Sequence, residues 1–461
     1  MFVAARSVQS REQLKLSDIF ANMVFIVAIV CGLATAHAQT APDSNLSSSH
    51  SPADLKAIAA SGAPPVSGTI TTDNWQHYRD YMPDGMVMLF EGKYFWKMTS
   101  DIQMDLGPAV LHPPPKNYLA ATEKYSSQVK LVELPDGGLT LSGYQGGIPF
   151  PNPAEPHAGW KVLANLWFRY LPHLTVDTNG VVCTMDSGNR VSCKAGVKVY
   201  RQLAYNTDPG VPAAISGAEG KYFTQHESVK EPEQDRYTTV LTISYKDLTK
   251  PEDVYVFIPS LRRYQRMSAS ARCSADLGTD ETPDDRRFGF NMNLTNIKAE
   301  LLGEKKILAL MDFSIPPGRF PENYDMPLGW PKPSWGKWQI RDVYVVNVTK
   351  LGSGSGHCLG KRVVYVDKAT YAPIWQDLYD EKMQPWRFVG FFLRTLDAPG
   401  IGTLDTSNST VYGFWDVKYS HATIFAEPGE GEPFYINQQA PNDFLDLERF
   451  TTPGGLSLIM R

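Results

Sequence analysis

The sequence predicts an α+β protein that is mainly β, in which a large antiparallel sheet forms a half-open barrel covered by short helices. After residue 170 the apolar residues recur with a period of two in many short segments. A long series of such strands with short connections is typical of an antiparallel meander that curls on itself. Helical periodicity is concentrated before residue 171. Several strands are apolar on both alternating faces, so each face of the sheet needs a cover.

The first 38 residues are predicted to be a signal peptide. A basic stretch precedes the short apolar run 21–33, and Ala36-His37-Ala38 supplies the small-x-small pattern that signal peptidase recognises. The apolar run is shorter than the roughly twenty residues that a membrane-spanning helix needs. We therefore expect cleavage before Gln39 and export into an oxidising compartment. The alternative is an uncleaved amphipathic anchor.

Residues 39–66 are rich in Ala, Ser and Pro and cannot bury much apolar surface, so we expect a flexible leader. The remainder is long enough for one large β domain or two smaller ones, and we predict a single domain over residues 67–461. The chain has 44 Lys and Arg against 49 Asp and Glu, a net charge of −5. This near balance gives no electrostatic basis for binding nucleic acid.

Four segments before residue 171 have apolar residues at helical spacing. They are residues 73–82, 85–95, 116–125 and 158–170. We expect these early helices to cover one face of the sheet, so that the other face can enclose a ligand cavity. A β-sandwich that is buried on both faces and has no cavity is the alternative.

Strands are predicted wherever the period is two and Gly, Pro, Asn or Asp residues mark the ends. They are residues 180–185, 191–203, 236–245, 253–258, 263–269, 297–302, 306–312, 338–349, 361–367, 373–380, 386–396 and 411–425. The phrase Asp-Val-Tyr-Val-Phe at 253–257 recurs as Asp-Val-Tyr-Val-Val at 342–346, with a looser copy at 362–366.

Aromatic residues of these strands are candidates to line the ligand cavity. They are Tyr255, Phe257, Tyr344, Tyr365, Trp375 and Trp386. Tyr occupies the same position in each copy of the repeated phrase. We therefore predict that Tyr255, Phe257, Tyr344 and Tyr365 share one face of the sheet, with the Val residues packed on the other face. Tyr tolerates a partly wet apolar site better than Val does. Ordinary core packing is the alternative for each of them.

The cysteines predict two disulfides. Cleavage would remove Cys31 and leave Cys183, Cys193, Cys273 and Cys358, an even number in an exported protein. The first two flank a turn rich in Asp, Ser, Gly and Asn, so we prefer one bridge across that hairpin and a second between the remaining pair. The other connectivities, and free buried thiols, are alternatives.

The sequence contains no recognisable catalytic, metal or nucleotide motif, and we predict no catalytic residue, no metal and no cofactor. One acidic cluster has a spacing that fits no EF-hand, so we predict a solvated loop. Its members are Asp276, Asp280, Glu281, Asp284 and Asp285.

Three arginines follow the turn at Pro259-Ser260 on a predicted hairpin. They are Arg262, Arg263 and Arg266. Guanidinium groups suit phosphate, so these residues are candidates to meet an anionic head group. The alternative is a solvated strand face with local ion pairs.

Short phrases along the chain resemble, in order, the bacterial domain-of-unknown-function 1329 family. They are residues 70–74, 106–108, 113–118, 121–124, 147–153, 159–161, 253–256, 361–367, 378–380, 384–386 and 452–461. Each phrase is weak alone, and together they are specific. The four mature cysteines depart from the family pattern and suggest a subgroup.

The family is similar to the periplasmic lipoprotein carriers LolA and LolB. The resemblance implies an incomplete barrel closed on one side by helices, with an apolar cavity for acyl chains. It also implies a periplasmic location in a Gram-negative bacterium. As partners it implies a hydrophobic cargo (lipid or lipoprotein), an RND-type exporter and an outer-membrane β-barrel protein. It brings no catalytic residue with it.

We therefore expect a non-enzymatic periplasmic carrier or binding protein for a lipid, lipoprotein or other hydrophobic cargo moving between the inner and outer membranes. At about 0.8 kcal/mol per methylene, a sixteen-carbon chain left in water loses roughly 13 kcal/mol, so such cargo needs a shielding cavity. The alternatives are a non-catalytic scaffold or adaptor of the exporter and the outer-membrane protein, and, third, a lipid-acting hydrolase.

Overall fold

The computed structural model describes residues 64–268, 272–276, 278–313, 320–352, 357–426 and 434–460, without the side chains of 406–410. The predicted signal peptide and most of the predicted leader lie outside these residues. In the part of the chain that is described, no helix is both long and apolar enough to cross a membrane.

One large sheet contains fourteen strands. They are β5 (Leu174–Asp186), β6 (Val191–Gln202), β7 (Lys221–Glu231), β8 (Thr239–Tyr245), β9 (Asp253–Ile258), β10 (Arg263–Arg266), β11 (Ile297–Phe313), β14 (Trp338–Lys350), β15 (Lys361–Asp367), β16 (Pro373–Tyr379), β17 (Pro385–Ala398), β18 (Gly402–Asp416), β19 (His421–Ala426) and β20 (Phe434–Ile436).

The sheet closes on itself at one end and stays open at the other. Its strands follow the order β10-β9-β8-β7-β6-β5-β19-β18-β17-β11-β14-β15-β16, and β20 pairs with β5. Because β16 also pairs with β17, strands β17, β11, β14, β15 and β16 form a hydrogen-bonded circuit. All pairings are antiparallel except β11 with β17. Among the described residues, β10 is a free edge.

The remaining elements are short. The α-helices are α3 (Asp84–Glu91), α4 (Lys116–Tyr125), α5 (Ala158–Trp167), α6 (Arg286–Gly289), α7 (Leu447–Thr451) and α8 (Pro453–Leu456). The 3-10 helices are η1 (Trp75–Tyr81), η2 (Ser126–Gln128), η3 (Glu233–Asp235), η4 (Pro259–Leu261), η5 (Leu294–Asn296), η6 (Pro333–Trp335), η7 (Asn437–Gln439) and η8 (Asn442–Phe444). Two-stranded pairs join β1 (Thr69–Ile70) to β2 (Met104–Asp105), β3 (Lys130–Glu133) to β4 (Leu139–Ser142), and β12 (Tyr324–Asp325) to β13 (Trp330–Pro331).

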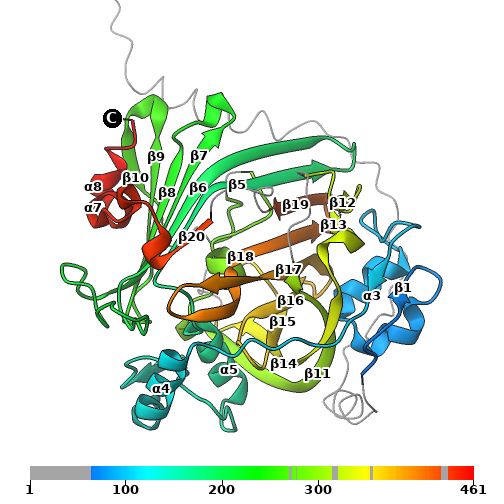
Figure 1. Cartoon of the computed structure of the whole chain (residues 1–461), viewed down its shortest axis with the longest axis horizontal. Helices are drawn as coiled ribbons and strands as arrows, with labels where there is room; N and C mark the ends of the chain where they lie inside the picture. Colours follow the sequence, from blue (N-terminus) through cyan, green and yellow to red (C-terminus); the bar gives the residue numbers. More distant parts are fainter. Residues whose placement is uncertain are drawn as a thin grey trace, which may run out of the picture. The chain divides into compact units, whose positions relative to one another are not determined.

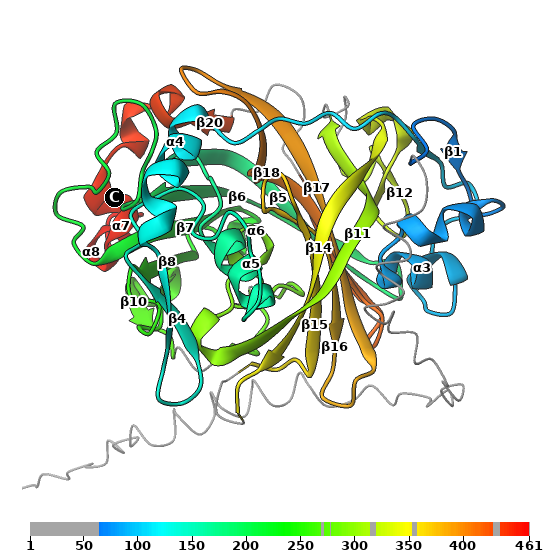
Figure 2. The same ribbon diagram turned by 90° about the horizontal axis from the view of Figure 1, so that it is seen from below.

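The inner face of the sheet, defined as the face that carries Val346 and Val364, is covered by α5 and by the segment between β10 and β11. Figure 2 shows α5 and α6 within the curve of the sheet. Every residue of α5 except Lys161 is buried. A side chain at Gly159 would meet the backbone of β11 at 2.6 Å, so only glycine lets the helix approach this closely. Trp160 donates from its indole N–H to the carbonyl of Leu294 at 3.0 Å.

The outer face of the sheet is covered by both ends of the described chain. The N-terminal part packs α3 against β16, where the backbone N–H of Gly85 donates to Asp377 Oδ1 at 3.0 Å. At the open end, Leu456 of α8 packs with Leu241 and Phe257 in one buried cluster. Figure 1 shows α7 and α8 beside β8, β9 and β10.

Both predicted disulfides are present. Cys183 and Cys193 stand directly opposite each other on β5 and β6, with a Cα–Cα distance of 4.0 Å. Cys273 and Cys358 have a Cα–Cα distance of 5.4 Å and join the segment before β11 to the segment before β15.

The predicted fold class is confirmed, and several elements match closely. Helix α4 and strands β9 and β15 have the predicted bounds. The first predicted helix is instead the 3-10 helix η1. The two strands predicted over 297–312 are one strand, because β11 continues through a bulge between Leu301 and Gly303. The strand predicted over 411–425 is two, because a turn separates β18 from β19.

Candidate functional site

A row of five directly paired residues crosses the inner face from β5 to β9. Asp177 pairs with Lys198, which pairs with Glu227. Glu227 pairs with Val240, which pairs with Val256. With about 4.8 Å between neighbouring strands, the row is about 19 Å long. One end of the row is charged and the other is apolar.

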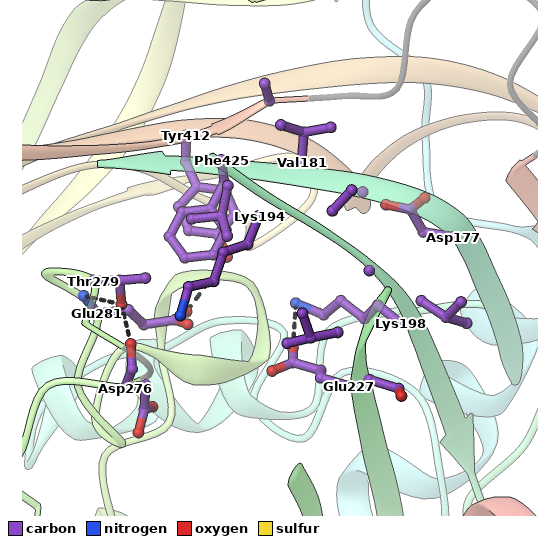
Figure 3. Close-up of a pocket in the computed structure, with 18 of the residues that line it drawn as sticks. Asp177, Val181, Lys194, Lys198, Glu227, Asp276, Thr279, Glu281, Tyr412 and Phe425 are labelled. Atoms are coloured by element: carbon purple, nitrogen blue, oxygen red, sulfur yellow. Dashed lines mark hydrogen bonds and ion pairs between the residues drawn. The ribbon is translucent and has the colours of Figure 1, made fainter. Parts of the chain in front are cut away.

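A first cavity of about 140 Å³ lies over the charged end of the row. It is lined by residues of β5, β6 and β7, by Tyr412 and Phe425 of β18 and β19, and by Glu281 and Phe288. Tyr412 and Phe425 stack with ring centroids 4.2 Å apart. Figure 3 shows these two rings and Glu281 on one side of the cavity, with Lys198 and Glu227 on the other.

Lys198 and Glu227 form an ion pair in this cavity, with Nζ and Oε1 3.0 Å apart. Gln225 also donates to Glu227 Oε1 at 2.6 Å. Burial opposes the charge of both groups. The ion pair and the neighbouring charges and hydrogen bonds together outweigh burial, so the pKa of Glu227 is lowered and the pKa of Lys198 is raised. Both side chains are therefore charged at neutral pH.

Glu281 is only 5% exposed and is held differently. Its Oε1 accepts a hydrogen bond from the hydroxyl of Tyr412 at 3.3 Å. Burial, and then the negative charge of Glu227, raise the pKa of Glu281 to about 8. Glu281 is therefore predominantly protonated at pH 7 and brings a neutral carboxyl group to the cavity.

A second cavity of about 200 Å³ lies over the apolar end of the row. Its apolar lining includes Val240, Val254, Val256 and Met267, and its polar lining includes Arg272. Val254 and Val256 lie two residues apart on β9 and therefore share one strand face, and both contribute to the lining. The cavity is thus amphipathic, with the strands as its apolar side.

An ion pair separates the two cavities. Arg286 binds Asp276 through two hydrogen bonds, of 2.6 and 2.7 Å. Asp276 lines both cavities, and Arg286 lines the second. Together the cavities reach the lower end of the roughly 300–1,000 Å³ that is typical of small-molecule sites. We call the row and its two cavities the inner-face groove.

The segment between β10 and β11 covers the groove, and we call its described residues 272–276 and 278–296 the plug segment. The plug segment contains the acidic cluster that was predicted to be a solvated loop, and that prediction is wrong. Asp284 pairs with Arg272 and lies 2.6 Å from Nδ1 of His357. Asp285 pairs with Arg362. Four of the five acidic side chains, Asp280, Glu281, Asp284 and Asp285, are buried, and Asp276 is partly buried. Asp284 and Asp285 tolerate burial because each forms an ion pair.

Two further arginines fix the plug segment to the rest of the inner face: Arg287, which belongs to the segment, and Arg169, which follows α5. Arg287 is 1% exposed, and its guanidinium lies 4.6 Å from the ring centroid of Trp167 and 4.4 Å from that of Phe223. Arg287 and Phe288 have φ of 58° and 57°, a left-handed conformation that is strained in non-glycine residues. Arg169 stabilises this turn by donating to the carbonyl of Arg287 at 3.0 Å.

Among the predicted cavity residues, the four that were expected to share one face do not share it. Tyr365 pairs directly with Val345, the neighbour of Tyr344, so Tyr344 and Tyr365 point to opposite faces. Tyr255 and Phe257 lie on the outer face, where they pack with Leu456. The physical reason is that α8 covers the Tyr face of β9 and leaves its Val face to the groove.

The two tryptophan candidates also lie away from the groove. Trp375 is buried on the outer face, where its ring stacks with Trp415 at a centroid distance of 5.9 Å. Trp386 is half-buried and donates to Asp416 Oδ2 at 2.8 Å. None of the six aromatic candidates lines either cavity.

The three predicted head-group arginines lie at the open edge. Arg262, Arg263 and Arg266 are all exposed, and none lines a cavity. Arg266 pairs with Asp253 on the neighbouring strand. A role in contacting an anionic group stays a prediction for these residues.

Sequence reasoning missed the polar residues of the groove. One signal for them was present in the sequence. Lys194 and Lys198 lie four residues apart in a predicted strand, so both charges lie on the same strand face. Glu227 lies on β7, which was not predicted. Among the described residues, no three His, Cys, Asp or Glu side chains are arranged to hold a metal ion.

Solved structures that match this chain share little sequence with it. A DUF1329 family protein from Desulfovibrio piger is 15% identical, with 65% of this chain and 100% of that chain covered and a TM-score of 0.44. A domain described as an outer membrane lipoprotein-sorting protein from Vibrio parahaemolyticus is 12% identical, with 62% and 95% covered and a TM-score of 0.41. A LolA superfamily protein from Nitrosomonas europaea is 11% identical, with 64% and 97% covered and a TM-score of 0.36.

The family assignment depends on the sequence. No curated protein matches this chain at a significant level. A family model described as "Protein of unknown function (DUF1329)" matches residues 69–454, which confirms the resemblance read from the sequence phrases. Because this match spans most of the chain, the protein belongs to the DUF1329 family.

Proposed function

We propose that this protein is a non-catalytic carrier of a hydrophobic cargo, such as a lipid or the acyl chains of a lipoprotein, between the inner and outer membranes. The single observation that carries the proposal is the inner-face groove. It combines an apolar half, around Val240 and Val256, with a charged half, around Lys198 and Glu227. An amphiphile has the same division into an apolar chain and a polar head.

The apolar half supplies the energy of binding. Each methylene removed from water contributes about 0.8 kcal/mol, so even partial burial of an acyl chain gives useful affinity. The row from Asp177 to Val256 gives the groove a length of about 19 Å, which suits an extended chain better than a compact ligand.

The plug segment has to move for a long chain to lie along the groove, because Arg286 and Asp276 stand between the two cavities. Ion pairs hold the part of the segment up to Arg286, whereas Phe288, Phe290, Met292 and Leu294 anchor the part after it in an apolar core. A buried ion pair is only slightly more stable than the same two charges in water, so lifting the ion-paired part costs less than exposing the apolar part. We propose that cargo enters by displacing the ion-paired part.

The periplasmic location belongs to the same proposal. Two disulfides are expected in an oxidising compartment and are rare in a reducing cytosol. The predicted signal peptide would direct the chain there. The partners implied by the family resemblance, an RND-type exporter and an outer-membrane β-barrel protein, would deliver and receive the cargo.

The test is the binding of a fluorescent fatty acid to Val256→Glu and to a matched control, Ile258→Glu. Both residues are half-buried on the same face of β9, but only Val256 lines a cavity. We expect Val256→Glu to raise Kd by roughly tenfold or more, because an unpaired carboxylate is costly in an apolar lining. Ile258→Glu should bind like the unmodified protein. Equal binding by both variants, with folding verified by thermal unfolding, would contradict the proposal.

One observation favours hydrolysis of lipid-like cargo as a second candidate function. The neutral carboxyl of Glu281 faces the first cavity beside Tyr412, and such a group can serve as a general acid. Fatty-acid esters separate the two functions. A carrier binds the ester and releases it intact, whereas a hydrolase liberates the acid and loses this activity in Glu281→Gln. Failure to bind either compound would favour the scaffold alternative.

A further inference from the structure

The hairpin between β9 and β10 exposes apolar side chains to solvent. Every residue from 261 to 268 is exposed. Leu261, Tyr264 and Met267 are 44%, 38% and 46% exposed, although each is a residue type that usually lies in a core or an interface. We call residues 261–268 the rim hairpin.

The rim hairpin also has uncompensated positive charge. Arg262 and Arg263 have no ion-pair partner among the described residues, and no acid lies between 254 and 275 in the sequence. The carboxylate of Asp253 already forms an ion pair with Arg266 and so does not neutralise either of the other two arginines. Two free guanidinium groups therefore stand beside three exposed apolar side chains.

Acidic residues of the neighbouring β7–β8 turn, at the same end of the sheet, are already paired. Asp235 pairs with Lys194 at 2.9 Å, and Glu233 pairs with Arg236 at 3.0 Å. These carboxylates are thus not the partners of the rim arginines. The charge of the rim hairpin is available to a negatively charged surface outside the protein.

The position of the rim hairpin links it to the groove. It forms the free edge of the sheet, and the N–H of Met267 donates to the carbonyl of Val254 at 2.7 Å. Met267 and Ser268 line the second cavity, together with Val254 and Val256. The exposed hairpin and the apolar half of the groove are therefore continuous.

We propose that the rim hairpin docks the protein on the surface of an anionic lipid bilayer. Exposed Leu, Tyr and Met side chains enter the boundary between head groups and acyl chains, and arginines bind the phosphates there. An acidic protein strand would satisfy the arginines but would leave Leu261 in water. The inference rests on the proposed function in one respect, because docking here brings the second cavity to the membrane for the transfer of cargo.

The experiment is sedimentation of the complete protein with lipid vesicles. One vesicle type contains phosphatidylcholine alone, and the other contains equal parts of phosphatidylcholine and anionic phosphatidylglycerol. We expect binding to the anionic vesicles only, with weaker binding at high salt. The double variant Arg262→Glu/Arg263→Glu should bind at least roughly thirtyfold more weakly. Leu261→Ser/Tyr264→Ser should also weaken binding while preserving the salt dependence.

Matched controls test whether the position of the residues matters. Lys116→Glu/Lys382→Glu makes the same change in net charge at two exposed sites on other elements. Met383→Ser/Tyr419→Ser removes two other exposed apolar side chains, which are 53% and 66% exposed. Both controls should bind anionic vesicles like the unmodified protein. The proposal is overturned if the controls lose as much vesicle binding as the rim variants, or if the unmodified protein does not bind anionic vesicles.

Binding of the fluorescent fatty acid in the absence of vesicles keeps the two proposals apart. The rim variants should keep this binding, because none of their substituted residues lines a cavity. Loss of fatty-acid binding in the Val256→Glu variant alone tests the groove, and loss of vesicle binding in the rim variants alone tests the docking surface. Either result stands if the other fails.

Discussion

Glu281 differs from the other four carboxylates of the plug segment in its electrostatic surroundings. Each of the other four contacts an arginine or a histidine. Within the described part of the chain, Glu281 has no such cation, and its hydrogen bond comes from the neutral hydroxyl of Tyr412. The first cavity therefore contains one carboxyl group that is easier to keep neutral than charged.

This difference predicts how stability depends on pH. The pKa of Glu281 is raised by burial from an ordinary value of 4.5 to about 8, so its protonated form is favoured in the folded state. Stability from this group is fully present below pH 4.5 and is lost as the pH rises toward 8. Glu281→Gln mimics the neutral carboxyl and should remove that loss. We expect the variant to gain thermal stability relative to the unmodified protein as the pH rises from 5 to 8.

Unfolding curves at several pH values check this expectation, because titrations shared by both proteins cancel in the difference. A tenfold change in an acid dissociation constant corresponds to about 1.4 kcal/mol, so the relative gain should be on the order of 1 kcal/mol or more. A difference in stability that stays constant over this range, or that changes in the opposite direction, would show that Glu281 is charged in the folded protein.

The faces of β9 illustrate what single residues reveal in a sequence. The alternation of Val and Tyr correctly predicts a strand with two apolar faces, and β9 has the predicted bounds. It does not tell which face meets the groove. That choice depends on Leu456, which packs with Phe257 from the far end of the chain. No local pattern around residue 257 contains this information.

At the scale of elements, the plug segment is fixed at both of its ends. Cys273 ties its beginning to Cys358, and β11 follows directly after its end. Between these points the segment is held by the ion pair of Asp285 with Arg362 of β15, by Arg287 packed among aromatic rings, and by buried apolar residues such as Phe290. We therefore expect the disulfide to limit how far the segment can lift from the groove.

The two disulfides should differ in their contribution to the free energy of unfolding. The Cys183–Cys193 bridge spans 10 residues and the Cys273–Cys358 bridge spans 85. The chain-entropy relation gives about 2.7 kcal/mol for the short loop and about 4.6 kcal/mol for the long loop. Removing the second bridge by Cys273→Ser/Cys358→Ser should thus destabilise the protein more than Cys183→Ser/Cys193→Ser does.

Chemical denaturation of the two double variants measures this difference directly. The hairpin bridge serves as the control, because it joins two strands that remain paired on either side of it. Equal losses of stability, or a larger loss from the hairpin bridge, would mean that the long loop is already restrained without its disulfide.

Elements were predictable from sequence where one pattern decides them. Lys116–Tyr125 has helical spacing after three prolines, and Lys361–Asp367 is apolar throughout its centre. Strand β7 was missed because the residues at its centre, from Thr224 to Ser228, are polar on both faces. Glu227 faces the groove, whereas His226 lies under Phe450 of α7, with ring centroids 5.1 Å apart. The acidic cluster was misread for a similar reason, since Arg362 and His357 lie more than seventy residues away from their aspartate partners.

At the scale of the whole domain, the two faces of the sheet are covered in different ways. The outer face is packed by apolar contacts from the N-terminal part and from α7 and α8. On the inner face the groove is roofed by a segment rich in buried charges. The inner face also has an apolar core, in which α5 and the plug-segment residues Phe290 and Leu294 pack with Val346 and Val364. Both faces therefore contribute to stability, and we assign cargo binding to the inner face, where the two cavities lie.

Photo-crosslinking tests this central claim most directly. A fatty acid with a diazirine on its chain would be bound, irradiated and located by mass spectrometry of the digested protein. We predict crosslinks on the lining of the inner-face groove, at Val229, Val240 and Val256, that unlabelled fatty acid abolishes. Crosslinks on the outer face, at Phe257 or Leu456, or labelling that unlabelled fatty acid does not reduce, would contradict the assignment of cargo binding to the inner face.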